Sequence, residues 1–281
     1  MANNIFKSLK GINIVSLALN VHGPVAANRL QNLGATVTKI EPPAGDPLAT
    51  YCPEWYRSLT KGQKVLKLDL KNSEDQANLF TLFEQTNLFI TSMRPNALER
   101  LGLGWNELHL RFTHLSHLAI VGYPKPDENI AGHNLTYQAA LGLLSPPELP
   151  RTLMVGLGTA ENAVSTALAQ IMMQKEDGQG NFAQLSIHEI AERFAAPLRY
   201  GLTQSEGLLG GGCEGYNLYQ TANGWIALAA LEPQFWQRIV EELNLKVTGK
   251  KELQSIFLTR TSAEWETWAK LKDIPLTSVT G

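Results

Sequence analysis

Residues 12–47 read INIVSLALNVHGPVAANRLQNLGATVTKIEPPAGDP, and this stretch decides the fold that the sequence predicts. Ile12–Leu19 has the apolar character of a buried strand, and His22-Gly-Pro24 ends it before an amphipathic helix over about residues 25–33. Thr36–Ile40 follows as a second short strand. This βαβ pattern indicates a parallel sheet, in which ligands bind beyond the carboxyl ends of the strands. The loops after these two strands are therefore the first places to look for a site.

The alternation of strands and helices continues through the first two thirds of the chain. Four more stretches have the pattern of strands: Lys64–Leu70, Leu88–Thr91, Leu115–Val121 and Ala183–Ile187. A long apolar helix is expected from about Ala160 to Gln174, with Thr159 as its N-cap. The fold class predicted is α/β, with a large domain built on a parallel sheet.

A change of composition predicts a domain boundary. Gly207–Gly215 contains five glycines in nine residues, which is typical of a hinge or linker. Beyond it, Asn223-Gly224 separates two alternating runs, and this is a strong signal for a β-hairpin. We therefore expect a large domain over residues 1–206 and a small α+β domain over residues 207–281.

Composition and charge exclude several classes of function. With 24 basic and 26 acidic side chains and no long run of either sign, the chain shows no nucleic-acid footprint and no polybasic membrane patch. No apolar run is long enough for a membrane span, and the first residues lack the apolar core of a signal peptide. Cys52 and Cys213 have no metal-ligand spacing. The expectation is a cytoplasmic protein with no metal, no nucleic-acid partner and no membrane contact.

Candidate site residues follow several of the predicted strands. His133 comes after a glycine at the start of a helix-patterned run, and an imidazole there can serve either as a catalytic base or as a simple helix cap. Arg94 lies just past a strand end, where an arginine can hold a phosphate or form a surface ion pair. Gly156 and Gly158 precede the expected long helix, so their N–H groups can face an oxyanion or phosphate, or the glycines can serve packing alone.

Several separated motifs, in the right order, resemble the family III CoA-transferases of the CaiB/BaiF type, and most of all the α-methylacyl-CoA racemase branch. The motifs are Gly34–Asp46, Leu66–Leu70, Arg94-Pro95, Leu101–Gly104, Gly132-His133, Gly178–Gly180 and Leu231–Trp236. The resemblance spans nearly the whole chain.

The resemblance implies a CoA-thioester site in a Rossmann-like large domain, a small second domain and an interlocked homodimer. It implies that Arg94 corresponds to an arginine near the CoA pyrophosphate, and that Lys61 and Lys64 belong to a basic loop near the nucleotide. The residue that matches His133 moves the α-proton of the thioester in the racemase branch. Glu232 matches an acidic residue contributed by the small domain. An α-proton beside a thioester is weakly acidic, so its removal requires a close base and hydrogen-bond donors for the enolate oxygen.

Two departures from the family pattern change the expected activity. The family aspartate, which precedes the long helix, falls at about Gly156 here, and no carboxylate occurs from Arg151 to Gly158. A glycine can neither form an acyl anhydride nor act as a base, so CoA transfer is not expected. In addition, relatives usually continue beyond the position of Val279 to complete the large domain, and that return segment is absent from this sequence.

These observations support three functional hypotheses. In the first, the protein binds an acyl-CoA thioester and exchanges its α-proton through His133, with Glu232 retained. In the second, it is a catalytically inactive family member that acts as a ligand-binding or assembly subunit. In the third, the scaffold is kept and the cleft accepts an unrelated acyl substrate.

Overall fold

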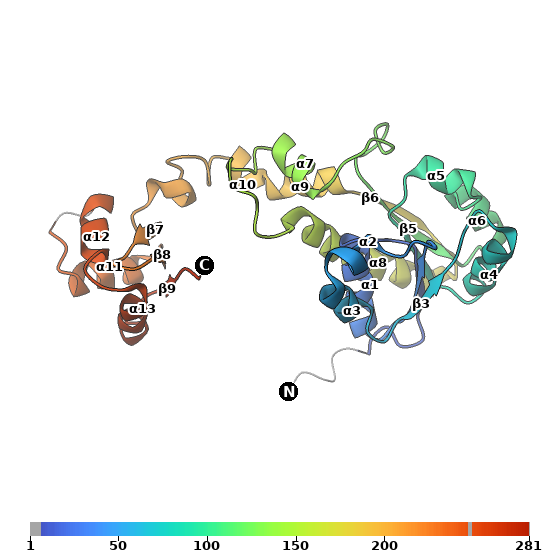
Figure 1. Cartoon of the computed structure of the whole chain (residues 1–281), viewed down its shortest axis with the longest axis horizontal. Coiled ribbons are helices and arrows are strands. Elements are labelled where there is room, and N and C mark those ends of the chain that lie inside the picture. The colour runs from blue at the N-terminus through green and yellow to red at the C-terminus, as the bar shows by residue number, and fades with distance from the viewer. Residues whose placement is uncertain (1–6, 247–248, 281) are drawn as a thin grey trace. The chain divides into compact units, whose positions relative to one another are not determined.

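The structure is a computed structural model that describes residues 7–246 and 249–280 (Figure 1). The chain divides into two units, residues 1–195 and residues 196–281. The first unit contains a parallel sheet covered by helices, and the second contains a small antiparallel sheet. The predicted α/β class is therefore confirmed.

Six strands form the sheet of the first unit, in the order β3-β2-β1-β4-β5-β6, and every neighbouring pair is parallel. The strands are β1 (Asn13–Ser16), β2 (Thr36–Glu41), β3 (Lys64–Lys67), β4 (Leu88–Thr91), β5 (Ser116–Val121) and β6 (Phe182–Ser186). Because all six run the same way, their carboxyl ends meet at one edge of the sheet.

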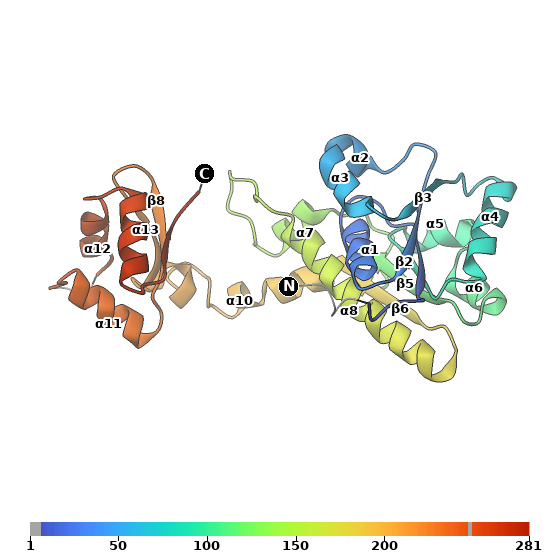
Figure 2. The same cartoon turned by 90° about the horizontal axis from the view of Figure 1, so that it is seen from below.

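Helices cover both faces of this sheet. They are α1 (His22–Asn32), α2 (Pro47–Tyr51), α3 (Pro53–Thr60), α4 (Ser73–Phe83), α5 (Pro95–Arg100), α6 (Trp105–Arg111), α7 (Asn134–Ala140), α8 (Met154–Asp177) and α9 (Ile187–Phe194). Figure 2 shows α1 and α8 on one side of the sheet and α4 and α6 on the other. Ile14 and Val15 are consecutive in β1 and are buried in two different hydrophobic clusters, because successive side chains of a strand point to opposite faces.

Small side chains allow α8 to lie close to α1 and the sheet. Ala160, Ala163 and Ala167 are fully buried and repeat at helical spacing, so they form one face of α8. This face packs in the cluster that contains Leu30 of α1 and Ile14 of β1. The close packing holds α8 against α1 and the sheet.

The start of α8 differs from the sequence-based expectation. The helix begins at Met154, so Gly156, Gly158 and Thr159 lie inside it, and Thr159 is not its N-cap. The physical reason is that the Thr159 hydroxyl donates to the carbonyl of Val155 one turn earlier (2.8 Å) and so is satisfied within the helix.

The second unit packs helices on a three-stranded antiparallel sheet in the order β7-β8-β9. Its strands are β7 (Tyr216–Gln220), β8 (Trp225–Ala229) and β9 (Leu276–Ser278), and its helices are α10 (Ala196–Arg199), η1 (Leu208–Gly212), α11 (Pro233–Glu242), α12 (Lys250–Phe257) and α13 (Ser262–Leu271). The hairpin predicted at Asn223-Gly224 is confirmed by the pairing of β7 with β8. Trp265 is fully buried in the core of this unit, and its indole N–H donates to the carbonyl of Phe257 (2.8 Å).

Across the described residues, none of the helices combines the length and apolar character that a membrane crossing requires.

Candidate functional site

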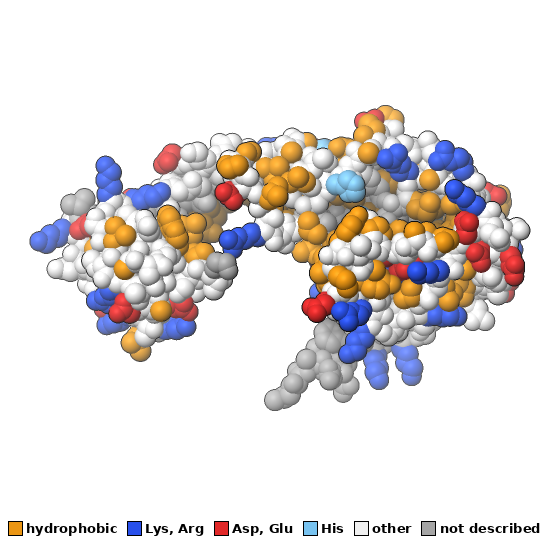
Figure 3. Space-filling view, in the orientation of Figure 1, with side chains coloured by type: hydrophobic (Ala, Val, Ile, Leu, Met, Phe, Trp, Pro, Cys, Tyr) orange, Lys and Arg blue, Asp and Glu red, His pale blue; other side chains and the backbone are white. Residues whose placement is uncertain are grey.

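A cavity of about 740 Å³ opens at the carboxyl edge of the parallel sheet in the first unit. Its walls include the segments that follow three strands: Leu19–His22 after β1, Ser92–Arg94 after β4, and Glu128–His133 in the loop after β5. This is the location predicted for ligands of a parallel sheet. In the space-filling view, a histidine lies among apolar side chains on this part of the surface (Figure 3).

His133 is the residue that directly precedes α7, and it lines the cavity. Its backbone N–H donates to Thr136 Oγ1 (3.0 Å), and the Thr136 hydroxyl donates to the carbonyl of His133 (2.9 Å). The backbone of His133 is thereby tied to the first turn of the helix. The residue is exposed, so its imidazole can exchange protons with water.

Gly156 joins the start of α8 to the start of α7. Its backbone N–H donates to Asn134 Oδ1 (3.1 Å), and it lines the cavity. A Cβ at this position would lie 3.9 Å from both Asn134 Oδ1 and Val21 Cγ1, which is ordinary van der Waals contact. A Cβ therefore fits at residue 156, the position that the sequence pattern predicts for the family aspartate.

A second histidine, His22, lines the same cavity and was not among the site residues predicted from the sequence. It is the first residue of α1 and lines the cavity, and its Nε2 is shielded from water with no hydrogen-bond partner in the described structure. Burial, with a smaller contribution from the nearby His133, lowers the pKa of His22 to about 4. His22 is therefore neutral near pH 7. Its position just after the first predicted strand was the signal in the sequence that could have identified it as a site residue.

Two more lining residues carry buried polar atoms that have no partner among the described residues: Glu128 through Oε2 and Tyr137 through its hydroxyl. The Tyr137 hydroxyl lies so close to Gly122 and Gly132 that a Cβ on either glycine would overlap it. Burial raises the pKa of Tyr137 to about 12, with a smaller contribution from Tyr123. The glycine before His133 is thus required by the tyrosine that packs beneath it.

Arg94 is the N-cap residue of α5, is exposed, and lines the cavity. Within residues 7–246 and 249–280, no carboxylate forms an ion pair with it. Its guanidinium group is therefore available for an anionic ligand.

The cavity brings together Arg94, His133 and Gly156, whereas the other predicted site residues lie elsewhere. Gly158 faces Phe194 of α9, where any Cβ would overlap the ring, so close packing accounts for this glycine. Lys61 follows α3 and Lys64 begins β3; both are exposed, and neither lines the cavity.

Glu232 belongs to the second unit, where it is the exposed N-cap residue of α11. Nor do the described residues include a cluster of His, Cys, Asp or Glu that could hold a metal ion.

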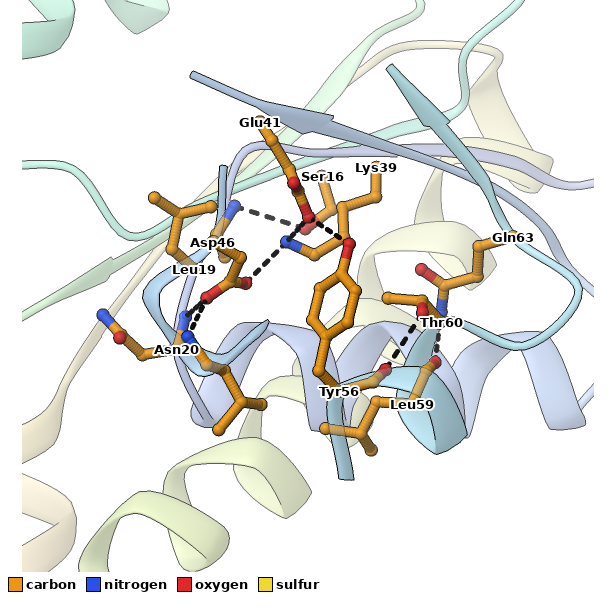
Figure 4. A network of polar contacts seen from close by, with 12 residues as sticks. Ser16, Leu19, Asn20, Lys39, Glu41, Asp46, Tyr56, Leu59, Thr60 and Gln63 are labelled. Atoms are coloured by element: carbon orange, nitrogen blue, oxygen red, sulfur yellow. Dashed lines mark hydrogen bonds and ion pairs between the residues drawn. The ribbon is translucent and has the colours of Figure 1, made fainter. Parts of the chain in front are cut away.

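A buried network of charges holds the loop between β1 and α1 (Figure 4). Lys39 Nζ lies 2.7 Å from Asp46 Oδ2 and 3.1 Å from Glu41 Oε1, and the Tyr56 hydroxyl donates to Glu41 (2.7 Å). Asp46 Oδ1 also accepts the backbone N–H of Asn20 (3.0 Å). Burial, followed by the hydrogen bond to Glu41, raises the pKa of Tyr56. The network therefore sets the path of the chain into His22.

The fold and the cavity define an α/β protein with a ligand site at the carboxyl edge of a parallel sheet and a separate small domain. The family model for CoA-transferase family III matches residues 9–281, and the chain belongs to this family. The resemblance seen in the sequence is thus confirmed.

Named relatives include racemases and transferases. The chain is 26% identical to human α-methylacyl-CoA racemase over 92% of this chain and 74% of the relative. It is 22% identical to the probable fatty acyl-CoA transferase Rv3272 of Mycobacterium tuberculosis over 98% of this chain and 86% of the relative. The crystal structure of Rv3272 shares the fold, with a TM-score of 0.85 at 20% identity, covering 98% of this chain and 86% of that one.

Proposed function

We propose that this protein binds an acyl-CoA thioester in the cavity of the first unit and exchanges the α-proton of the acyl group through His133. The observation that carries the proposal is the convergence of His133, Arg94 and Gly156 on one cavity at the carboxyl edge of the sheet. The names of the relatives support the substrate class, because both the human racemase and the mycobacterial transferase are named for acyl-CoA compounds.

In the proposed binding mode, basic side chains bind the anionic groups of CoA. Arg94, without an ion-pair partner in the described structure, faces the pyrophosphate of CoA, and Lys61 and Lys64 attract the nucleotide from the exposed surface near α3 and β3. The acyl group then lies in the cavity beside His133. Glu232, which belongs to the second unit, stays a site residue proposed from the family resemblance alone.

In the proposed reaction, the neutral imidazole of His133 takes the α-proton, and the electron pair of the C–H bond moves toward the thioester oxygen to give an enolate. Because His133 is exposed, the imidazolium can exchange its proton with solvent before it returns one to the α-carbon. The net result is exchange of the α-hydrogen, with no acyl group transferred to the protein.

Exchange is tested by incubating the protein with a 2-methylacyl-CoA in deuterated water and measuring deuterium at the α-carbon by mass spectrometry. We expect uptake by the native chain and loss of uptake in His133→Ala. If the native chain takes up no deuterium, or if His133→Ala exchanges as fast as the native chain, His133 is not the base.

Binding is tested separately by thermal unfolding with CoA and acetyl-CoA. A ligand at a hundred times its dissociation constant stabilises the folded state by about 2.7 kcal/mol, so a clear rise in Tm is expected. The matched variant Arg94→Gln removes the charge but keeps much of the side chain, and we expect it to weaken CoA binding without changing the Tm of the free protein.

A second candidate function is that of a catalytically inactive subunit that binds a thioester. Gly156 favours it, because no carboxylate stands at that position of the cavity. Ligand-induced stabilisation without any deuterium uptake is the result that separates this function from proton exchange.

We further propose that the protein forms an interlocked homodimer in the cytoplasm, as the family resemblance implies. Sedimentation equilibrium of the full chain tests the dimer, and a monomer across the micromolar range would contradict it.

A further inference from the structure

We propose that His22 is a catalytic residue of the cavity: its Nε2–H donates a hydrogen bond to the thioester carbonyl oxygen and stabilises the enolate that forms when His133 removes the α-proton. This inference rests on the proposed function and adds a second imidazole to it.

The location of His22 is the first argument. It lies beyond the carboxyl end of β1, it begins an eleven-residue helix, and it lines the same cavity as His133. Its Nε2 has no hydrogen-bond partner among the described residues. An unpartnered buried nitrogen lowers stability, and such an atom is often retained where a ligand supplies the missing partner.

The charge state of His22 suits a donor. Its imidazole is neutral near pH 7 because burial lowers its pKa to about 4. The first turn of α1 contains no acidic residue, so the partial positive charge of the helix N-terminus is not offset there. A neutral imidazole at a helix N-terminus can polarise a carbonyl group by donating an N–H while keeping its proton.

The backbone holds the two histidine segments in a fixed relation. Asp46 accepts the N–H of Asn20 and so fixes the loop that leads into His22. Gly156 stands between the segments, because a Cβ there would lie 3.9 Å from Val21 and 3.9 Å from Asn134, the neighbours of His22 and His133 in sequence. An acyl group near Gly156 therefore lies beside both segments that carry the histidines. Because Nε2 is shielded from water, bringing the carbonyl oxygen to it requires a shift of lining side chains.

The two histidines then have different tasks. His133 Nε2 or Nδ1 forms a bond to the α-proton as the C–H bond breaks, and the electron pair moves onto the thioester oxygen. His22 stabilises that oxygen without transferring a proton. A proton or deuteron returned from the His133 imidazolium restores the thioester and the neutral base, so the step needs no other reactant.

The direct test measures the bound carbonyl. Acetyl-CoA labelled with ¹³C at the carbonyl is added to the full chain, and the C=O stretch is recorded by infrared difference spectroscopy. We expect a lower frequency for the bound thioester than for the free one, and loss of this shift in His22→Ala. His22→Gln places an amide N–H near the position of Nε2, so it should restore most of the shift. His109→Gln, a histidine of α6 outside the cavity, serves as the matched control.

The same variants are compared in deuterium exchange. Loss of one donor to an oxyanion typically lowers the rate by a factor of about 10² to 10³, and we expect this for His22→Ala with little change in the dissociation constant of the thioester. His22→Gln should recover most of the rate.

The outcomes separate the two proposals. A bound thioester whose frequency is unchanged, or is lowered equally in His22→Ala, overturns the role of His22 and leaves the proposed function intact. A lowered frequency without any deuterium uptake supports His22 and overturns proton exchange. Absence of binding overturns both.

Discussion

The backbone N–H of Gly156 donates a 3.1 Å hydrogen bond to Asn134 Oδ1, which links the first turn of α8 to the first residue of α7. This bond ties together two segments that are 22 residues apart in sequence. Because His133 directly precedes Asn134, the bond also restricts the base proposed for the reaction. A Cβ at residue 156 would lie 3.9 Å from Asn134 Oδ1, so the bond does not depend on the glycine.

We predict that Asn134→Ala destabilises the first unit by about 1–3 kcal/mol, because the N–H of Gly156 loses its partner. Asn134→Asp keeps the acceptor oxygen and should cost less. Urea unfolding followed by far-ultraviolet circular dichroism measures both. Equal stability of Asn134→Ala and the native chain would show that water or a neighbouring group replaces the bond.

A carboxylate can be introduced at residue 156. The nearest atoms to a Cβ there are 3.9 Å away, so Gly156→Asp should fold, and a negative charge near the N-terminus of α8 is favourable. We predict that Gly156→Asp raises the rate of α-deuterium exchange at least tenfold by adding a second proton-transferring group. Gly156→Asn has the same shape without the acid and is the control; equal rates in the two variants would exclude proton transfer by the new carboxyl.

The buried network around Lys39 predicts a large effect on stability. Its side chain is 2% exposed and lies between Glu41 and Asp46, whose side chains are 3% and 0% exposed. Lys39→Met leaves two buried carboxylates without a cation, so we expect a loss of about 3–5 kcal/mol in the free energy of unfolding.

Arg29→Met is the matched comparison for Lys39→Met. It removes the exposed ion pair with Glu161, in which both side chains are more than half exposed, and should cost under about 1 kcal/mol. Similar losses in the two variants would mean that burial does not control the strength of these pairs.

Lowering the pH should destabilise the first unit, because two of its histidines are held neutral in the folded state. Burial lowers the pKa of His22 to about 4 and that of His117 to about 3, so both stay neutral in the folded protein while the unfolded chain binds protons below about pH 6.5. The free energy of unfolding should therefore fall as pH drops from about 6.5 to 4, by about 1.4 kcal/mol per pH unit for each histidine, and should be independent of them above pH 7.

Chemical denaturation at several pH values measures this slope. His117→Gln removes one titrating group and should make the slope shallower, although it also disturbs the contact of the ring with Thr91 Oγ1 (3.0 Å). An unchanged slope would show that His117 is protonated in the folded state.

The predictions that depend only on short, continuous stretches of sequence agree best with the structure. The βαβ pattern of Ile12–Ile40 and the hairpin at Asn223-Gly224 depend on local hydrophobic periodicity and turn geometry, and both are present. The start of α8 was predicted wrongly, because a threonine that can cap a helix can also bond back to the preceding turn, and Thr159 does the latter.

The site could be predicted only in part. Arg94, His133 and Gly156 were each selected from a position next to a predicted element, and all three line the cavity. Gly158 has the same local signal as Gly156, but its environment is set by Phe194 of α9, 36 residues further along the chain. Local patterns do not tell which of two such glycines faces a cavity and which faces a ring.

The sequence by itself determined the class of fold, the alternation of strands and helices along the chain, and the family. These depend on residue types and their spacing. Only the tertiary structure decided that His22 shares a cavity with His133, and that the Tyr137 hydroxyl packs against Gly122 and Gly132. The physical reason is that the carboxyl edge of a parallel sheet collects loops that are far apart in sequence, and the burial of α1 against α8 sets how closely they approach.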